Sequence, residues 1–421
     1  MAPIEASHEV GPGTPRLLRA INERALLDHL RSAGPTSRAQ LARATGLSKP
    51  TVSNALANLE QAGLVRPVGR SAPSRGRTAL LYEPDPTAAY VVGIDIGRSW
   101  VRVAAADLSG EIVARRDERN RARSATALVE TVGALTHDVV AGGGLTWKQV
   151  AHGVVGGPGV FDPESGRLRH APNLPGWSRP GLADALRKAL VPTLELDNDA
   201  NLAAIGERTY GSGRGVANFV YVFVGTGVGM GIIIGGSLYR GSRGAAGEVA
   251  YAPLPADDAR RALAEADRSA RLRGILEEAA SADAIVRTAK ALGMKGRLSA
   301  KRIFSEARGG DPLAVATVEA EAERLALVVG TVAAILDPEL VVLGGGVGGN
   351  IDLLRPPLER QLERLTPLDV PIAGGELGQD AIVLGAIATA LRTARDIVFE
   401  ERAGGTQVAA PTAGGPGRPR G

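Results

Sequence analysis

The stretch from Gly34 to Val65 constrains the fold most, because helix-breaking and helix-capping residues recur in it at the spacing of short helices. Its first two residues, glycine and proline, end an amphipathic helix predicted over residues 22–30. Ser37 and Ser48 stand where the N-caps of two further helices fall, and Gly46 between them supplies a tight turn. This order predicts a helix-turn-helix, and the apolar runs on either side of the following Gly/Ser/Arg-rich loop predict a β-hairpin wing.

The helix after Ser48 has a face suited to DNA. Its apolar residues recur at helical spacing, which leaves short polar side chains and one lysine toward solvent. Such side chains match base edges and phosphates in a major groove, and arginines in a flexible loop suit a minor groove or phosphates. The residues predicted to contact DNA are Ser48, Lys49, Thr51, Ser53, Asn54, Arg75 and Arg77.

Charge is spread unevenly along the chain. The segment from Arg16 to Glu83 contains eleven arginines and lysines but only four carboxylates, although the net charge of the whole chain is only +4. A basic head on a faintly acidic body is the electrostatic pattern of a DNA-binding module attached to another domain. A protein-docking module of three helices and a hairpin is the alternative. The agreement of helix, turn, polar face and basic loop favours DNA.

Composition excludes several classes of protein. The 421 residues contain no cysteine, which excludes disulfides and thiolate-bound zinc and fits a reducing compartment. No apolar run reaches the ~18 residues that a membrane span needs. The first ten residues lack the basic and apolar regions of a secretory signal. We therefore expect a cytoplasmic protein with no membrane partner.

From Tyr90 onward the pattern becomes that of an α/β domain. Runs of β-branched residues lead into glycines, and several of these lead into helices. In such folds the loops at the strand ends hold ligands. The segments are GIDIG (93–97), GVVGGPGVFD (153–162), LELDNDAN (194–201), VFVGTGVGMG (222–231) and VVLGGGVGG (341–349).

Together with the helix-turn-helix, these segments resemble the ROK family (repressor, open reading frame, kinase) over about residues 36–391. The resemblance implies an α/β fold class: an N-terminal winged helix-turn-helix plus a two-subdomain actin-like ATPase (sugar kinase/RNase H-like) fold. It implies five regions, which are a flexible N-terminus (1–15), the winged helix-turn-helix (16–85), a first actin-like subdomain (86–200 with 386–400), a second one (201–385) and a disordered tail (403–421).

The resemblance also implies a sugar site. Its predicted residues are Gly157, Gly159, Asn173, Asn198, Asp199, Glu248 and Tyr251. Asp199 matches the family's general base, which takes the proton from the attacking hydroxyl. A local role as a helix N-cap is the alternative for Asn198-Asp199, because both precede a helical stretch. Tyr251 stands where the family often has a histidine, which leaves the identity of the ligand open.

The nucleotide side departs from the family pattern. The positions that match it are Asp95, Gly97, Gly225, Thr226, Gly227 and Gly345. The resemblance implies that the acid at Asp95 can hold a hydrated Mg²⁺ and that glycine lets the backbone approach phosphate. The family's usual Gly-Thr after Gly97 is replaced by Arg98-Ser99, and an arginine there would crowd the nucleotide or replace its charge. This substitution favours a vestigial ATP/Mg site, while tight strand-helix turns kept for packing are the alternative for the glycines. The segment after Tyr251 lacks cysteine and histidine, so we expect no metal, no zinc and no required cofactor.

These observations favour a sugar-responsive DNA-binding regulator of carbohydrate metabolism, predicted to be a repressor. The kinase-like domain would serve as a sensor of a sugar or sugar phosphate. The expected partners are double-stranded operator DNA and a second copy of the chain, in a homodimer or homotetramer. The first alternative is an active ATP-dependent sugar kinase with a DNA-binding head. The second is a constitutive DNA-binding protein whose body only dimerises.

Overall fold

A computed structural model of the chain describes residues 15–70, 78–162, 167–169, 181–190, 193–254 and 273–403. Backbone contacts divide the chain into two compact units. The small unit comprises Met1–Tyr90, Asp107–Ser109 and Thr393–Gly421, and the large unit comprises Val91–Ala106 and Gly110–Arg392. The subdomain boundaries expected from the sequence stay a prediction.

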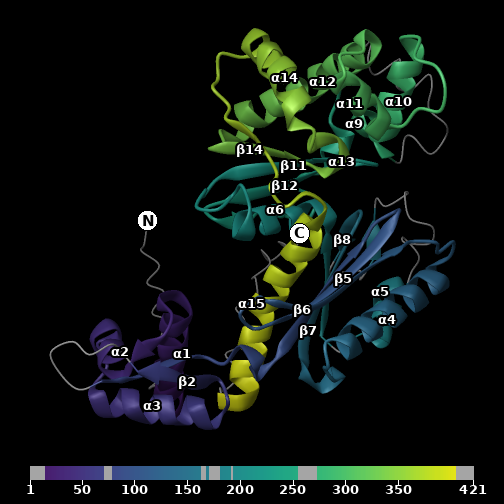
Figure 1. The fold of residues 1–421 in the computed structure, drawn as a ribbon. Coiled ribbons are helices and arrows are strands. Elements are labelled where there is room, and N and C mark those ends of the chain that lie inside the picture. Colours follow the sequence, from purple (N-terminus) through teal and green to yellow (C-terminus); the bar gives the residue numbers. More distant parts are fainter. Residues whose placement is uncertain are drawn as a thin grey trace, which may run out of the picture. The chain divides into compact units, whose positions relative to one another are not determined.

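The small unit is a winged helix. Helices α1 (Pro15–Ala33), α2 (Arg38–Thr45) and α3 (Lys49–Gln61) precede strands β2 (Val65–Arg70) and β3 (Leu80–Pro84). The short β1 (Thr36–Ser37) completes a three-stranded sheet of order β1-β3-β2. Figure 1 labels the three helices and β2 of this unit. A 3₁₀ turn, η1 (Pro86–Ala88), then leads toward the large unit's first strand.

Local sequence explains where these helices begin and end. Ser37 caps α2 in a capping box, because its side chain accepts from the Gln40 amide while the Gln40 side chain accepts from the Ser37 amide. Gly46 ends α2 with φ 73°, a left-handed conformation that glycine adopts without strain. Ser48 caps α3, with Pro50 in the first turn. The predicted caps and turn are confirmed.

The last turns of helix α15 (Ala381–Ala403) also belong to the small unit. Arg24 of α1 forms an ion pair with Asp396, and its guanidinium lies 5.2 Å from the centre of the Phe399 ring. Arg402 donates to the carbonyl oxygen of Ala88. Residues more than 300 positions apart in the chain are therefore fastened together within the small unit.

The large unit contains two five-stranded sheets. The first has the order β10-β7-β4-β5-β6, with strands Leu194–Asn198, Val150–Gly157, Tyr90–Ile96, Trp100–Asp107 and Ile112–Arg119. Helices α4 (Ala125–Gly142) and α5 (Leu182–Ala189) contribute apolar side chains to its core. Smaller elements here are η2 (Trp147–Gln149) and the β8-β9 hairpin (Val160–Asp162, Arg167–Arg169).

The second sheet has the order β13-β12-β11-β14-β15. Its strands are Ser237–Leu238, Val228–Ile234, Phe219–Val224, Leu340–Gly344 and Ile372–Gly374. The described helices of this half are α6 (Asp199–Tyr210), α9 (Ile275–Ala280), α10 (Ala282–Ala291), α11 (Ala300–Arg308), α12 (Pro312–Leu336), α13 (Gly345–Gly348) and α14 (Ile351–Leu365), with 3₁₀ turns η3 (Val249–Tyr251) and η4 (Gly378–Asp380).

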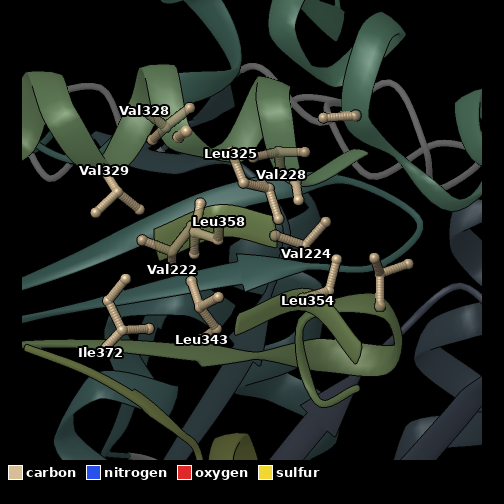
Figure 2. Packing of buried hydrophobic residues seen from close by; sticks show 14 of the residues in the cluster. Val222, Val224, Val228, Leu325, Val328, Val329, Leu343, Leu354, Leu358 and Ile372 are labelled. Atoms are coloured by element: carbon tan, nitrogen blue, oxygen red, sulfur yellow. The ribbon is translucent and has the colours of Figure 1, made fainter. Parts of the chain in front are cut away.

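A continuous apolar core joins this sheet to α12 and α14. Figure 2 shows Val222 and Val224 of β11 packed among Leu325 of α12 and Leu354 and Leu358 of α14. The other face of the sheet meets α6, with a glycine at the contact: a Cβ on Gly231 would lie 2.5 Å from the Ala200 carbonyl oxygen. The close approach of α6 fixes the helix start at which Asn198 and Asp199 lie.

The first turns of helix α15 pack closely against α6. A Cβ on Gly385 would lie 1.8 Å from the carbonyl oxygen of Leu202, and one on Gly206 would lie 2.3 Å from that of Ala381. Both positions therefore admit only glycine at this helix spacing. On α6, the buried Glu207 accepts hydrogen bonds from the backbone amides of Ser212, Glu376 and Leu377. The loop that enters η4 and α15 is thus fastened to α6.

Candidate functional site

Helix α3 presents a polar face to solvent. Val52, Leu56 and Leu59 are fully buried in the small unit. Of the predicted DNA contacts, Ser48, Lys49 and Asn54 are exposed, and Thr51 and Ser53 are half-buried. Ser48 is the N-cap of α3, and the other four residues lie on its first two turns, the end that meets base edges in helix-turn-helix proteins.

The far end of α3 is fastened to α1. The side-chain amide of Asn58 donates a 2.8 Å hydrogen bond to a carboxylate oxygen of Glu23, which is 2% exposed. In the wing, Arg70 is exposed at the end of β2. Arg75 and Arg77, the two wing residues predicted to contact DNA, lie outside the described residues.

A cavity of about 610 Å³ lies in the large unit, lined by loops at the ends of its strands. Its wall gathers residues that the sequence placed in two predicted sites: Asp95, Gly97, Gly159, Asn198, Asp199, Gly225, Thr226, Gly227, Glu248, Tyr251 and Gly345. Gly157 is buried in β7 and is not part of this lining, and Asn173 lies outside the described residues. We call this cavity the cleft.

The start of α6 separates the roles of Asn198 and Asp199. Asn198 is the N-cap: its side-chain oxygen accepts from the amides of Ala200 (2.8 Å) and Asn201 (3.3 Å), and its side-chain nitrogen donates to the carbonyl of Gly159 (3.1 Å). Asp199 is the first helical residue and lies in the cleft wall. Burial raises its pKa to about 6, against the effect of backbone amides.

Two more carboxylates lie in the same wall. Burial raises the pKa of Glu248 to about 7, and the negative charges of Asp199 and Glu277 add to that rise. Glu277 is 8% exposed, and its carboxylate accepts a 3.1 Å hydrogen bond from the amide of Val228. Tyr251 is 39% exposed, and its pKa is raised by burial and by Glu248 and Glu277. Sequence reasoning missed Glu277; an acid in the first turn of the short α9 is the signal it left.

Asp95 is paired with an arginine that sequence reasoning also missed. Arg102 donates a 2.8 Å hydrogen bond to the Asp95 carboxylate and another of 2.8 Å to the side-chain oxygen of Gln379, and its Nε lies 3.6 Å from Asp117. The side chains of Arg102 and Asp95 are 11% and 3% exposed. Burial raises the pKa of Asp95 to about 7, although Arg102 lowers it. The Arg102 guanidinium is therefore paired with the carboxylate that a hydrated Mg²⁺ would need.

A second arginine extends this network. Arg115 of β6 binds Asp117 at 2.9 Å and Asp380 at 2.7 Å. Together Arg102 and Arg115 fasten η4, the turn directly before α15, to the first sheet.

Backbone and side-chain groups of the protein itself contact the glycine loops of the cleft. The Gly225 amide donates to the Gly227 carbonyl at 2.9 Å. The side chain of Tyr221 is buried, and burial raises the pKa of its hydroxyl. The same hydroxyl lies 2.0 Å from where a Cβ on Gly344 would be, so it sits directly on this loop.

The donor set does not fit a metal. Among the described residues, no group of three or more His, Cys, Asp or Glu side chains is placed to hold a metal ion. Asp95, the one acid that the family pattern assigns to a magnesium shell, is held by Arg102.

Comparison with known proteins decides the family. Residues 91–393 match the model described as the ROK family. The chain belongs to the ROK family. Residues 19–77 match the model of the MarR family, which agrees with the winged helix of the small unit. The chain therefore joins a ROK domain to a MarR-type winged helix.

Its relatives include repressors and kinases. A putative xylose repressor of Caldicellulosiruptor sp. (strain Rt8B.4) is 27% identical over 396 residues, which cover 89% of this chain and 96% of the relative. A glucokinase of Halalkalibacterium halodurans is 31% identical over 315 residues, which cover 70% of this chain and 93% of the relative.

Solved structures show the same fold. A ROK family transcriptional regulator described as a homolog of the E. coli MLC protein superposes with a TM-score of 0.74 at 20% identity, covering 92% of this chain and 99% of that one. A ROK glucokinase from Streptomyces griseus, solved with glucose and AMPPNP, superposes at 0.61 with 26% identity, covering 72% of this chain and 100% of its own. Among the described helices, none is long and apolar enough to cross a membrane.

Proposed function

We propose that this ROK protein is a sugar-responsive transcriptional repressor. The observation that carries the proposal is the presence, on one chain, of an exposed polar face at the start of α3 and a cleft lined by carboxylates and amides. Paired donors and acceptors of this kind suit the vicinal hydroxyls of a sugar. Relatives that match the chain over both units are named as xylose repressors.

The DNA contacts follow from α3. Lys49 contributes a cation for a phosphate, and Thr51 and Asn54 contribute hydrogen-bonding groups for base edges. A palindromic operator requires two such helices related by a two-fold axis, so we propose that the repressor binds as a homodimer or homotetramer. The sugar-site residues proposed for the cleft are Gly159, Asn198, Asp199, Glu248 and Tyr251, all of which line it.

The proposed mechanism is a shift between two populations. A sugar in the cleft favours one degree of cleft closure, and the two heads of the dimer then no longer match their half-sites. Helix α15 is a suitable covalent link, because its first residue, Ala381, lines the cleft and its Asp396 binds Arg24 of α1. The repressor requires neither nucleotide nor metal in this mechanism.

A gel-shift screen tests the proposal. Full-length protein is bound to DNA from upstream of its own coding sequence and titrated with pentoses, hexoses, amino sugars and their phosphates. We expect one sugar to release the DNA. Asp199→Ala should still bind DNA but lose the response, whereas Lys49→Ala should weaken DNA binding and still bind the sugar. Failure of every compound to change DNA binding contradicts the proposal.

An active sugar kinase is the second candidate. Two observations favour it: the carboxyl of Asp199 lies in the cleft wall with its pKa raised to about 6, and two relatives are named as glucokinases. Asp199 would accept the proton of the hydroxyl that attacks the γ-phosphate. The Arg102–Asp95 pair argues against it. An ADP-release assay over the same sugars decides: turnover abolished by Asp199→Ala supports a kinase, and no turnover on any sugar ends the idea.

A further inference from the structure

The turn η4 connects the cleft to helix α15. Gly378 and Gln379 of this turn line the cleft, and so do Ala381 and Ile382, the first two residues of the helix. A molecule bound in this part of the cleft therefore lies against the start of α15. The helix continues for 23 residues, which is about 35 Å at the usual helical rise, and its last turns belong to the small unit.

A network of polar side chains fastens η4 to the first sheet. Arg102 of β5 donates to the side-chain oxygen of Gln379 at 2.8 Å, and Arg115 of β6 donates to a carboxylate oxygen of Asp380 at 2.7 Å. Asp117 links the two arginines, because Arg115 donates to both of its oxygens at 2.9 Å and the Nε of Arg102 lies 3.6 Å from it. We call these five residues the η4 clamp.

The segments before and after η4 are also held. Just before the turn, the buried carboxylate of Glu207 in α6 accepts from the amides of Glu376 at 3.2 Å and Leu377 at 3.0 Å. Just after it, α15 packs directly on β4, where a Cβ on Gly93 would lie 2.8 Å from the Val383 carbonyl oxygen. The turn therefore lies between a fastened loop and a tightly packed helix.

This arrangement determines whether a change in the cleft reaches the helix. A turn absorbs a small displacement by adjusting its own φ and ψ angles. When its side chains are bound to a sheet, it cannot do so without breaking those hydrogen bonds, and the displacement passes to the next element. That element is α15, whose last turns carry Asp396 and Arg402, the partners of Arg24 and of the Ala88 carbonyl oxygen in the small unit.

We infer that the η4 clamp couples the cleft to the DNA-binding head, with Arg115 and Asp380 as positioning residues. The inference rests on the proposed function, because it concerns how the DNA binding of a regulator responds to a ligand. Both residues belong to the large unit, and neither is among the described residues that line the cleft. Their side chains are 29% and 42% exposed, so the pair adds little to stability. Arg115 and Asp380 therefore set how strongly the cleft and the head communicate, while the affinity of each separate site depends on other residues.

The coupling factor of the full-length protein tests this inference. It is the ratio of two affinities for DNA from upstream of the protein's own coding sequence, measured by fluorescence anisotropy without and with saturating sugar. The probe is xylose or glucose, whichever releases the wild-type protein from DNA. Calorimetric titration gives the sugar affinity of the same proteins without DNA. Arg115→Met removes the donor to Asp380, and Asp380→Asn removes the charge while keeping a side chain that can cap a helix.

In both variants we expect the sugar affinity without DNA and the DNA affinity without sugar to match the wild type. The coupling factor should fall by at least about twofold, as substitutions along a coupling network do. The double variant should match Arg115→Met, because both substitutions break the same contact. Arg116→Met is the control: it removes the next arginine of β6, which binds Asp138 of α4 at 2.6 Å, and it should leave the coupling factor unchanged.

The outcomes separate this inference from the proposed function. If the wild-type protein responds to sugar and both single variants keep its coupling factor, the repressor stands and the inference is overturned. Loss of sugar binding by the variants without DNA also overturns the inference, because it would place the two residues in the sugar site itself. If no sugar changes the DNA affinity of the wild-type protein, the proposed function and the inference both fail.

Discussion

Replacing Arg102 tests whether its guanidinium stabilises the buried Asp95 carboxylate. In Arg102→Met, the buried Asp95 loses a partner at 2.8 Å, and its side chain is only 3% exposed. Breaking a buried ion pair by removing one partner costs about 3–5 kcal/mol when the remaining group stays charged. The remaining group avoids this cost by holding its proton, so the loss of stability depends on pH.

The sign follows from the pKa of Asp95, which burial raises from about 3.8 in the unfolded chain to about 7 in the folded protein. Because the folded protein holds this proton more tightly, stability falls as pH rises from about 4 to about 7 and then levels off. Removing Arg102 raises the folded pKa further, so in the variant the fall continues above pH 7. Each pH unit there adds up to about 1.4 kcal/mol, or about 2–3 kcal/mol between pH 6 and pH 9.

Urea unfolding followed by tryptophan fluorescence measures this loss. The two tryptophans within the described residues, Trp100 and Trp147, belong to the large unit, so their signal reports the unit that contains Asp95. The control is Asp95→Asn in the Arg102→Met background, which has no carboxylate to titrate and should show no added loss above pH 7. An equal loss of stability in Arg102→Met at pH 6 and pH 9 would refute the reasoning.

Three further predictions concern other parts of the molecule. Lys49→Ala should weaken DNA binding on any sequence and lower the slope of log affinity against log salt by about 1, measured by fluorescence anisotropy. The control Lys148→Ala should change neither quantity. An unchanged slope in Lys49→Ala would show that Lys49 of α3 does not contact a DNA phosphate. Gly385→Ala places a Cβ 1.8 Å from a carbonyl oxygen and should lower the free energy of unfolding of the large unit by about 1–3 kcal/mol or more in urea; no loss would show that α6 and α15 separate freely. Ser37→Ala removes the capping box and should cost about 1 kcal/mol, seen by circular dichroism as a lower melting temperature; Ser37→Asp should restore most of it, and an unchanged melting temperature in Ser37→Ala would show that the cap adds no stability.

The sequence predicted well those features that depend on neighbouring residues. Ser37, Gly46 and Ser48 mark the helix boundaries because capping and left-handed turns are local properties of the chain. The resemblance to ROK proteins also placed Asp199 and Glu248 in one cleft, since motif positions carry their relative placement with the fold.

The Arg102–Asp95 pair was missed, although the sequence contains a signal for it. The Gly97 amide donates to the Trp100 carbonyl, so these two residues face each other in a tight hairpin. Two positions further along each strand, Asp95 then faces Arg102 on the same side. Working out the hairpin register would have found the pair, whereas motif matching passes over a residue that departs from the family pattern.

Other contacts depend on strand order and cannot be read locally. Tyr221 reaches the Gly345 loop because β11 and β14 are parallel neighbours, with Phe223 beside Gly344. These strands are more than 100 residues apart in the chain, and no local periodicity specifies that they pair. The contact between Tyr221 and the glycine loop at Gly344 could therefore not be predicted from local sequence.

The account depends most on coupling between the cleft and the DNA-binding head, and reciprocal titration tests it directly. The affinity of the full-length protein for operator DNA is measured with and without saturating sugar, and the affinity for the sugar is measured with and without saturating operator. Linkage predicts that both affinities fall by the same factor, in the range of about 5–150-fold. A sugar affinity that stays constant on operator DNA would show that the cleft and the head act independently.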